Sequence, residues 1–330
     1  MIQLFFLFTC VSSVFARLRS EWAQFTTFQD RFNKKYDSVE ELNQRFQLFI
    51  TNIRAISHHN SDFNQNFTMG MNQFTDLSPS EFKTIYASGF NGPVSKSGCS
   101  TFTSSASNAP IEINWTEKGA VTSVKDQGQC GSCWAFSATG AIESAWAISK
   151  GELLNFSEQE LVDCATGLKY RNHGCNGGLM DSAFNYVMDN GQCLDDSYPY
   201  TSGVSKTSGD CQKCSAVAKI TSCSDVKPND QISLKGAVYL KPVSVAISAD
   251  TVLFQSYSSG VITSASCYTS LDHGVLIVGY GEENGLKYWL VKNSWGESWG
   301  DAGYVKIGRS ESTDDAGVCG IGMQPSFPSV

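Results

Sequence analysis

The sequence of 330 residues predicts an α+β protein in which a helical half is followed by a β-barrel-like half, with a helical arm ahead of both. Apolar side chains at helical spacing between residues 134 and 151 indicate the helical half. From Ile220 onward valine, isoleucine, tyrosine and glycine dominate, which is typical of strands. Between the arm and the two halves, residues 88–110 are rich in serine, glycine, asparagine and threonine, which predicts an exposed, cleavable linker.

The composition divides the chain into two parts. Hydrophobic residues make up 41% and aromatic residues 12%, as in folded globular proteins. Residues 17–108 carry nine lysines and arginines against eight acidic residues, and residues 109–330 carry 15 against 24. The net charge of −8 disfavours nucleic acid and anionic membranes as main partners. The chain is therefore a nearly neutral arm joined to an acidic body, with the boundary at residue 108.

The first residues are typical of a signal peptide. Residues 1–16, MIQLFFLFTCVSSVFA, combine an apolar run with small residues ahead of Arg17. The run is too short to span a bilayer and no second long apolar stretch follows, so we expect no membrane span. The secretory pathway oxidises thiols, which agrees with twelve cysteines. Three sequons make three asparagines candidates for glycosylation: Asn66, Asn114 and Asn155.

Two patterns predict the elements of the arm. Steps of three and four residues place one set on a single helical face: Glu41, Arg45, Phe49, Asn52, Ile56 and Asn60. In the segment GMNQFTD a second set recurs every other residue, as along a strand: Gly70, Asn72, Phe74 and Asp76. An ordinary amphipathic helix followed by a strand would show the same spacing. Together, the two patterns resemble the signatures of the inhibitory propeptide of papain-like cysteine proteases, the cathepsin L-like group in particular.

The body is expected to contain three helices and then four strands. The first helix follows Cys133 and ends at Gly151. The second starts at Ser157, which has Glu160 at capping-box spacing. The third lies in GGLMDSAFNYVMDNG and ends at Gly191. The four strands are PVSVAIS, HGVLIVGYG, KYWLVKN and GYVKIG.

The segment DQGQCGSCWAF raises three interpretations of Cys130 and Cys133. A zinc site would need two more ligands, which Cys211 and Cys214 could supply, but the secretory route favours disulfides and we expect no metal. A redox pair would require a Cys-x-x-Cys that opens a helix after a strand. A nucleophile requires a thiol at a helix start, where the helix dipole and free N–H groups stabilise a thiolate, and Cys133 has that position.

Two downstream motifs favour the nucleophile. LDHGVLIVGYG places His273 at the start of a strand, and YWLVKNSWGESWG places Asn293 at the end of the next one. With the Cys-Gly-Ser-Cys-Trp segment they resemble papain-like cysteine proteases from about Trp22 to the end of the chain. The resemblance implies a papain-like two-lobed fold, with the active-site cleft between a helical lobe and a β-barrel-like lobe.

By this resemblance the chain is the precursor of a cysteine endopeptidase that works through a thioester acyl-enzyme and without a cofactor. Cys133 is the expected nucleophile, His273 the general base and then acid, and Asn293 the group that orients the imidazole. Gln127 is the expected oxyanion donor, together with the Cys133 backbone N–H, and Trp295 shields the Asn293–His273 contact. A non-catalytic binding protein on the same fold is the alternative from another class.

The resemblance also implies the disulfides. The expected pairs are Cys130–Cys175, Cys164–Cys211 and Cys267–Cys319, with Cys193–Cys214 as a fourth. Residues 109–330 hold ten cysteines, so after removal of the nucleophile one is left over, and we expect this to be Cys223.

The resemblance further implies a substrate cleft and partners. Gly177 and Gly178 offer backbone to an extended substrate. The pocket for the second residue before the scissile bond is expected to consist of five walls and the floor residue Gln324; the walls are Leu179, Met180, Ala246, Leu271 and Gly274. Because Gln324 is neutral, we expect a preference for apolar residues there.

Expected partners are protein and peptide substrates, the chain's own propeptide (residues 17–108) and protein inhibitors of papain-like proteases. We expect a monomer in an acidic lysosome- or vacuole-like compartment or outside the cell. Acid is expected to loosen the arm through carboxylates such as Asp76 and Glu41.

Overall fold

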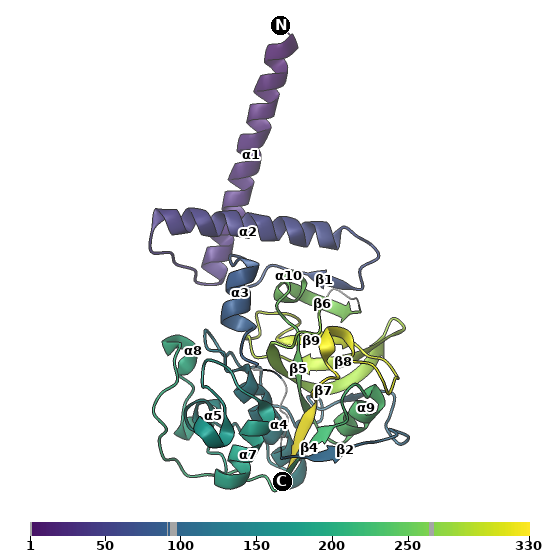
Figure 1. Cartoon of the computed structure of the whole chain (residues 1–330). Helices are drawn as coiled ribbons and strands as arrows, with labels where there is room; N and C mark the ends of the chain where they lie inside the picture. The colour runs from purple at the N-terminus through teal and green to yellow at the C-terminus, as the bar shows by residue number, and fades with distance from the viewer. Residues whose placement is uncertain (1, 91, 93–97, 264–266) are drawn as a thin grey trace.

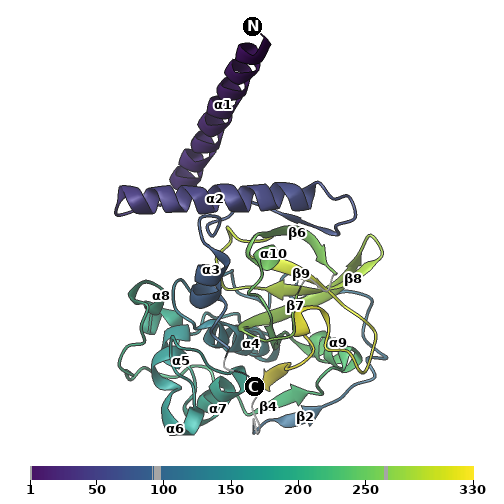
Figure 2. The same ribbon diagram turned by 45° about the horizontal axis from the view of Figure 1, so that its top comes forward.

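A two-lobed body carries the N-terminal arm at one end (Figures 1 and 2). The computed structural model describes residues 2–90, 92, 98–263 and 267–330, with side chains from Arg17 onward. The α-helices are α1 Ile2–Arg31, α2 Val39–Asn60, α3 Pro79–Tyr86, α4 Cys133–Lys150, α5 Glu158–Cys164, α6 Gly167–Tyr170, α7 Met180–Asn190, α8 Ser202–Ser205, α9 Gln231–Leu240 and α10 Val252–Gln255. The strands are β1 Phe67–Met69, β2 Ser100–Phe102, β3 Ile113–Asn114, β4 Ser222–Val226, β5 Val243–Ile247, β6 Tyr257–Ile262, β7 His273–Glu283, β8 Leu286–Lys292, β9 Tyr304–Gly308 and β10 Ser326–Ser329. Two 3₁₀ turns are η1 Asp195–Ser197 and η2 Val318–Gly320.

The arm has a small aromatic core of its own. Helix α1 extends away from the body and crosses α2 (Figure 1). Phe25 and Phe28 of α1 and Phe49 of α2 are fully buried where the two helices meet. Ser38 caps α2 by accepting a hydrogen bond from the Glu41 N–H, so the predicted arm helix begins directly after this capping residue. No helix in the described part of the chain is both long and apolar enough to cross a bilayer.

The strand predicted for residues 70–76 of the arm is wrong. Residues 70–72 have no regular structure and residues 73–76 form a turn, and β1 ends before them. The Asn72 side chain accepts a hydrogen bond from the Phe74 N–H (2.9 Å), and the Thr75 hydroxyl donates to the Asn72 carbonyl (2.8 Å). Short polar side chains that bind nearby backbone compete with strand pairing, which explains the turn despite the alternating pattern.

The helical lobe is built around α4, which packs against α5 and α7 on one side and against β5, β7 and β10 on the other. Its residues from Cys133 to Ala145 are all buried. Gly151 ends α4 with φ 75°, a left-handed conformation that glycine adopts without strain. The three helices predicted for the body are confirmed as α4, α5 and α7. Helix α4 thus lies at the junction of the two lobes, and so does Cys133, its first residue.

The β lobe is one open ten-stranded sheet in the described residues, with the order β1-β6-β9-β8-β7-β5-β10-β4-β2 and with β3 beside β7. The four predicted strands are confirmed as β5, β7, β8 and β9. Strand β7 is central, and antiparallel pairing aligns His273 with Ile247 of β5. The two ends of the strand order, β1 and β2, both come from residues before 109. The N-terminal part of the chain therefore covers both edges of the sheet.

Five disulfides join ten cysteines of the described residues. The four expected pairs are present: Cys130–Cys175, Cys164–Cys211, Cys193–Cys214 and Cys267–Cys319. The expectation that Cys223 is left over is wrong, because Cys223 is bonded to Cys99. Counting cysteines from residue 109 onward excluded Cys99, which β2 carries to the body. The predicted linker is corrected with it, since residues 88–110 include β2.

Candidate active site

The free thiol lies where the lobes meet. Cys133 is the free cysteine among the described residues, fully buried as the first residue of α4. The backbone N–H of Gly274 donates to its sulfur at 3.2 Å. Gly274 follows His273, so this contact brings the start of β7, and with it His273, beside the start of α4. A helix N-terminus and an N–H donor are both features that stabilise a thiolate.

The imidazole of His273 is held by an amide and an indole. Its Nε2 lies 2.7 Å from Oδ1 of Asn293, the residue that follows β8. The Trp295 ring stacks on the imidazole, with centroids 4.5 Å apart and planes at 27°. Nδ1 has no hydrogen-bond partner among the described residues, although it is buried. The Asn293 contact therefore fixes the ring and leaves the other nitrogen for a proton transfer.

Gln127 is fully buried and connects the segment before α4 with the residue after Asn293. Its Oε1 accepts from the Ser294 hydroxyl at 2.8 Å, and its Nε2 donates to the Cys130 carbonyl at 3.0 Å. A side-chain amide carries two N–H donors, so one remains for another acceptor. The four residues expected at a catalytic centre, Cys133, His273, Asn293 and Gln127, are thus gathered by the fold around the start of α4.

The arm closes this site. The carbonyl of Gly89 accepts from the Gly178 N–H at 3.1 Å, and the Phe90 N–H donates to the Asp272 carbonyl at 3.1 Å. A methyl group on Gly89 would lie 2.6 Å from the Cys133 sulfur, so only glycine fits over the thiol. Phe90 and Gly178 pair in parallel. The sequence alone gave no signal for Gly89 and Phe90, because they lie in a stretch with a linker's composition.

Closure also sets the protonation of the pair. Burial raises the pKa of the Cys133 thiol to about 12, against the weaker opposing effect of the Gly274 N–H. Burial lowers the pKa of His273 to about 4, again against the opposing effect of the hydrogen bond that its ring donates to Asn293. Both groups are therefore neutral near pH 7 while the arm is in place. A thiolate–imidazolium pair is disfavoured in this closed form.

Aromatic and polar side chains of the arm pack on the tryptophan that covers His273. The rings of Phe74 and Phe82 meet Trp295 edge-on, at centroid distances of 5.7 and 5.1 Å. Gln73 donates to the Trp295 carbonyl at 2.6 Å and accepts from Ser298 at 2.8 Å. The arm thus binds the residues that position the imidazole as well as the thiol.

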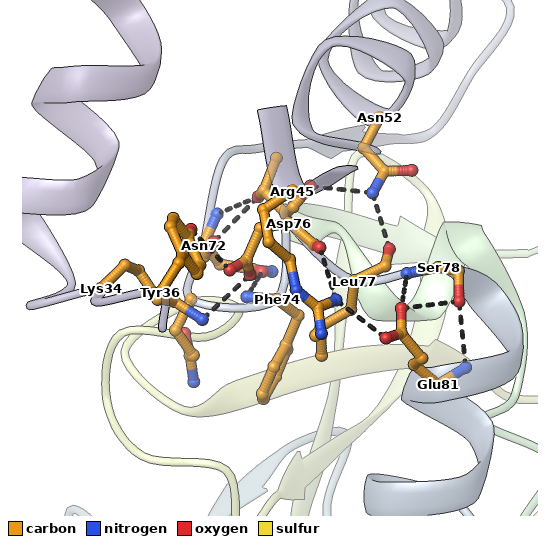
Figure 3. A network of polar contacts seen from close by, with 12 residues as sticks. Lys34, Tyr36, Arg45, Asn52, Asn72, Phe74, Asp76, Leu77, Ser78 and Glu81 are labelled. Atoms are coloured by element: carbon orange, nitrogen blue, oxygen red, sulfur yellow. Dashed lines mark hydrogen bonds and ion pairs between the residues drawn. The ribbon is translucent and has the colours of Figure 1, made fainter. Parts of the chain in front are cut away.

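A polar network connects α2 with the turn that carries these aromatics (Figure 3). Asp76 accepts from Lys34 and Tyr36, each at 2.9 Å. Arg45 donates to the Asp76 carbonyl at 3.2 Å and pairs with Glu81 at 2.9 Å. The arm motif residues that the sequence singled out are therefore largely the ones that join α2 to the turn.

Two further side chains of the network complete the connection. Buried Asn52 donates to the carbonyls of Thr75 and Leu77, at 2.8 and 2.9 Å. Glu81 has a lowered pKa: burial raises it, but hydrogen bonds from Ser78 and the pair with Arg45 outweigh this effect. These contacts satisfy backbone groups that would otherwise be unpaired in the turn.

The expected substrate residues fall into two groups. Gly177 and Gly178 precede α7, and the Gly178 N–H donates a hydrogen bond to Gly89 of the arm. Four of the expected pocket walls belong to one apolar cluster that also contains Phe90: Leu179, Met180, Ala246 and Leu271. A methyl group on Gly274, the fifth wall, would lie 3.3 Å from the Met180 sulfur. Gln324 is half-buried and lies two residues before β10.

A buried group of charges behind the site was not anticipated. Lys125 pairs with Glu143 at 2.8 Å and with Glu158 at 2.6 Å, and both carboxylates are almost fully buried. Lys125 lies two residues before Gln127, and its carbonyl accepts a hydrogen bond from the Gly296 N–H at 3.0 Å. Breaking such a pair is strongly destabilising, because it leaves an uncompensated charge. Lys125 therefore anchors the segment that carries Gln127. Its charge alone could not distinguish it from a surface lysine.

Two groups of acidic and sulfur side chains come close enough together to be considered as metal ligands in the described part of the chain. One is Glu160, Cys193 and Cys214, and the other is Cys99, Asp181 and Asp225. The cysteines of both groups are bonded in disulfides, so they offer no thiolate to a metal.

The geometry defines a thiol–imidazole–amide site closed by an N-terminal segment, and comparison with known proteins agrees. Residues 109–329 match the family described as Papain family cysteine protease, and residues 25–82 match the Cathepsin propeptide inhibitor domain (I29). The chain belongs to the papain family of cysteine proteases and carries the inhibitory propeptide of a zymogen.

Individual relatives extend the likeness over almost the whole chain. It is 44% identical over 303 residues to the "Probable cysteine protease RDL2" of Arabidopsis thaliana, covering 90% of this chain and 82% of that protein. Among solved structures, the recombinant stem bromelain precursor superposes with a TM-score of 0.85 at 38% identity, covering 94% of this chain and 99% of that one. A digestive procathepsin L 3 from the larval midgut of Tenebrio molitor gives 0.85 at 37% identity, with the same coverage.

Proposed function

We propose that Cys133 is the nucleophile of a cysteine endopeptidase and that His273 exchanges protons with it. The observation that carries this assignment is the 2.7 Å contact of His273 Nε2 with Asn293, which leaves Nδ1 free in a site whose one free thiol is Cys133. With the arm released, water reaches the cleft and the burial that keeps both groups neutral is relieved. The helix dipole of α4 then favours the thiolate, and Asn293 favours the imidazolium.

The reaction follows from these roles. The Cys133 thiolate adds to the scissile carbonyl, and the negative charge on its oxygen is met by Gln127 Nε2 and the Cys133 N–H. Such a donor contributes about 3 kcal/mol in enzymes where it has been removed. Collapse breaks the C–N bond as His273 gives its proton to the leaving amine, which leaves a thioester. A water that gives a proton to His273 then hydrolyses the thioester, releasing the acid and restoring the pair.

The precursor is proposed to be divided as the composition indicates. Residues 1–16 would be the signal peptide, residues 17–108 the inhibitory propeptide and residues 109–330 the peptidase domain. Passage through the secretory pathway is supported by five disulfides, which form in oxidising compartments. The destination would be an acidic lysosome- or vacuole-like compartment or the extracellular space, with the mature enzyme a monomer. The glycosylation candidates of the precursor stay Asn66, Asn114 and Asn155, of which Asn66 and Asn155 are exposed.

We propose a substrate preference for apolar residues at the second position before the scissile bond. The arm supports it, because Phe90 already lies in the apolar cluster formed by Leu179, Met180 and Ala246. Burial of each additional methylene contributes about 0.8 kcal/mol. At the floor, Gln324 offers hydrogen bonds but no charge, so it cannot compensate a buried guanidinium. Protein and peptide chains that present leucine, valine or phenylalanine are therefore the proposed substrates.

A pair of fluorogenic dipeptides that differ only at that residue tests the preference. On the activated enzyme we expect leucine to exceed arginine by about tenfold or more in kcat/KM, which corresponds to about 1.4 kcal/mol. Gln324→Glu should raise the value for arginine, and the matched Gln324→Met variant should not. Equal rates for both substrates on the unchanged enzyme would disprove the preference, as would a glutamate variant without any gain for arginine.

A further inference from the structure

The disulfide between Cys99 and Cys223 crosses the expected boundary between propeptide and peptidase. Cys223 lies in β4 of the peptidase domain, and Cys99 lies ten residues after Gly89, the residue over the thiol. Their Cα atoms are 4.8 Å apart. A covalent bond therefore joins the body to the segment that was expected to leave it.

The segment around Cys99 is also built into the sheet. Residues 99–104, here called the strap, include β2, which pairs in parallel with β4 from Ser100↔Ser224 to Phe102↔Val226. The Phe102 carbonyl accepts from the Lys227 N–H at 3.0 Å. Its ring meets that of Phe327 in β10 edge-on, at 5.2 Å. The strap thus completes one edge of the sheet, where unpaired backbone would otherwise face solvent.

The body is shaped to receive the end of the strap. The Ser104 N–H donates to the Ser233 hydroxyl at 3.0 Å, and that hydroxyl donates to the Ser104 carbonyl at 3.3 Å. At Gly236 of α9 a side chain would overlap the Ser104 hydroxyl, so the glycine makes room for it. These contacts all lie on the β4–α9–β10 side, away from Cys133 and its cleft. None of them involves Cys133 or His273, so opening of the cleft does not require them to break.

The Cys99–Cys223 disulfide determines which backbone cleavage can release the arm. A cut after Asn108 breaks one C–N bond with one water and leaves the sulfur–sulfur bond intact. Residues 17–108 would then stay attached through Cys99, only ten residues from Gly89. A segment held so closely has an effective concentration on the order of millimolar. It would rebind over Cys133, so cleavage after Asn108 alone does not activate the enzyme.

We propose that the cut that frees the active site lies on the N-terminal side of Cys99, and that the strap remains a disulfide-held strand of the mature peptidase. This moves the working boundary from 108/109 to a position before Cys99. A second cut near residue 108 would leave residues 99–108 attached as a separate short chain. The inference rests on the family's zymogen organisation and is independent of which residues perform catalysis.

Intact mass of the activated enzyme tests this. The wild-type zymogen is activated in acid without reductant, and open-site molecules are captured with a biotinylated thiol-directed peptide probe. We expect every captured molecule to contain Cys99 before reduction, and Edman sequencing to find an N-terminus ahead of Cys99. Captured molecules that begin after Cys99, with Cys223 reactive toward N-ethylmaleimide, would overturn the proposal. Captured molecules that still carry residues 17–98 through the disulfide would overturn it as well.

The bond itself is measured without any activity. Non-reducing peptide mapping of the unprocessed Cys133→Ala chain should give one peptide pair that joins Cys99 to Cys223, and any other pairing contradicts the proposal. The double variant Cys99→Ser with Cys223→Ser is the control. Its captured molecules should lose residues 99–108 once the chain is cut near 108, and its melting temperature should fall. Retention of that segment by the double variant would show that the disulfide is not what holds it.

Discussion

At the scale of single residues, whether the site is closed depends on the residue that lies over the Cys133 sulfur. Gly89 places backbone rather than a side chain over Cys133, and its carbonyl occupies the N–H of Gly178 that an extended substrate would use. The parallel pairing of Phe90 with Gly178 gives the arm a fixed direction in the cleft. In this closed form burial raises the pKa of Cys133 and lowers that of His273, so both groups are neutral while the segment covers the thiol.

Gly89→Ala should weaken closure. The added methyl group would lie 2.6 Å from the Cys133 sulfur and 2.7 Å from the Gly131 carbonyl, which is backbone and cannot move aside easily. Overpacking of this kind costs about 1–3 kcal/mol. We expect the unprocessed variant to react with a thiol-directed probe at neutral pH at least fivefold faster than wild type. Ser88→Ala, at an exposed neighbouring position, is the control. A glycine variant that reacts no faster than this control would contradict the account.

At the scale of elements, the hold of the arm depends on the join between α2 and the turn that follows β1. Asn52 contributes two hydrogen bonds from a buried position to the carbonyls of Thr75 and Leu77. Asn52→Ala leaves both carbonyls without these donors, at a cost of about 1–3 kcal/mol. The turn carries Phe74 against Trp295, so its loosening should open the site.

We therefore expect the Asn52→Ala precursor to be processed at least fivefold faster than the wild-type precursor at neutral pH. The loss of the precursor band in gel electrophoresis measures this rate. Asn43→Ala changes an exposed asparagine of the same helix and should leave the rate unchanged. An unchanged rate for Asn52→Ala would mean that this join does not limit opening.

Elements with a strong period or cap could be predicted from the sequence, and those fixed by distant contacts could not. Helix α4 follows from its apolar spacing and Gly151, and β7 from its run of branched residues. The segment 70–76 alternates like a strand, and only local side-chain hydrogen bonds distinguish it. Strand β2 lies in a stretch of linker composition because its order comes from Cys223 and β4, more than 100 residues away. The residues of the thiol–imidazole–amide site could be selected from the sequence because each lies in a local motif, whereas the cover formed by Gly89 is defined by position in space.

At the scale of the whole molecule, closure should be sensitive to acid. In the closed form burial lowers the pKa of His273 to about 4 and raises that of Cys133, so opening transfers a proton from Cys133 to His273 and these two groups together bind no additional proton. Glu81, with its pKa lowered below 4.5, loses its contribution as pH falls through that lower value. Burial raises the pKa of Asp272 to about 7 and acts in the opposite sense. Lys83, which the arm contributes, lowers the pKa of this carboxyl and so opposes the effect of burial.

We expect processing of the purified precursor to accelerate as pH is lowered from 7 to 4, with the Cys133→Ala variant inert throughout. Conversion is measured by the loss of the precursor band after a fixed incubation. Processing as fast at pH 7 as at pH 4 would remove acid as the trigger.

The central claim is that Cys133 is the reacting thiol and that the arm covers it. The direct measurement is labelling by an epoxide peptide probe, with mass spectrometry of the modified residue, on the precursor and on the activated enzyme. The account predicts modification at Cys133 alone, at least tenfold faster after the arm has been released. Modification at another residue, or equal rates before and after release, would contradict it.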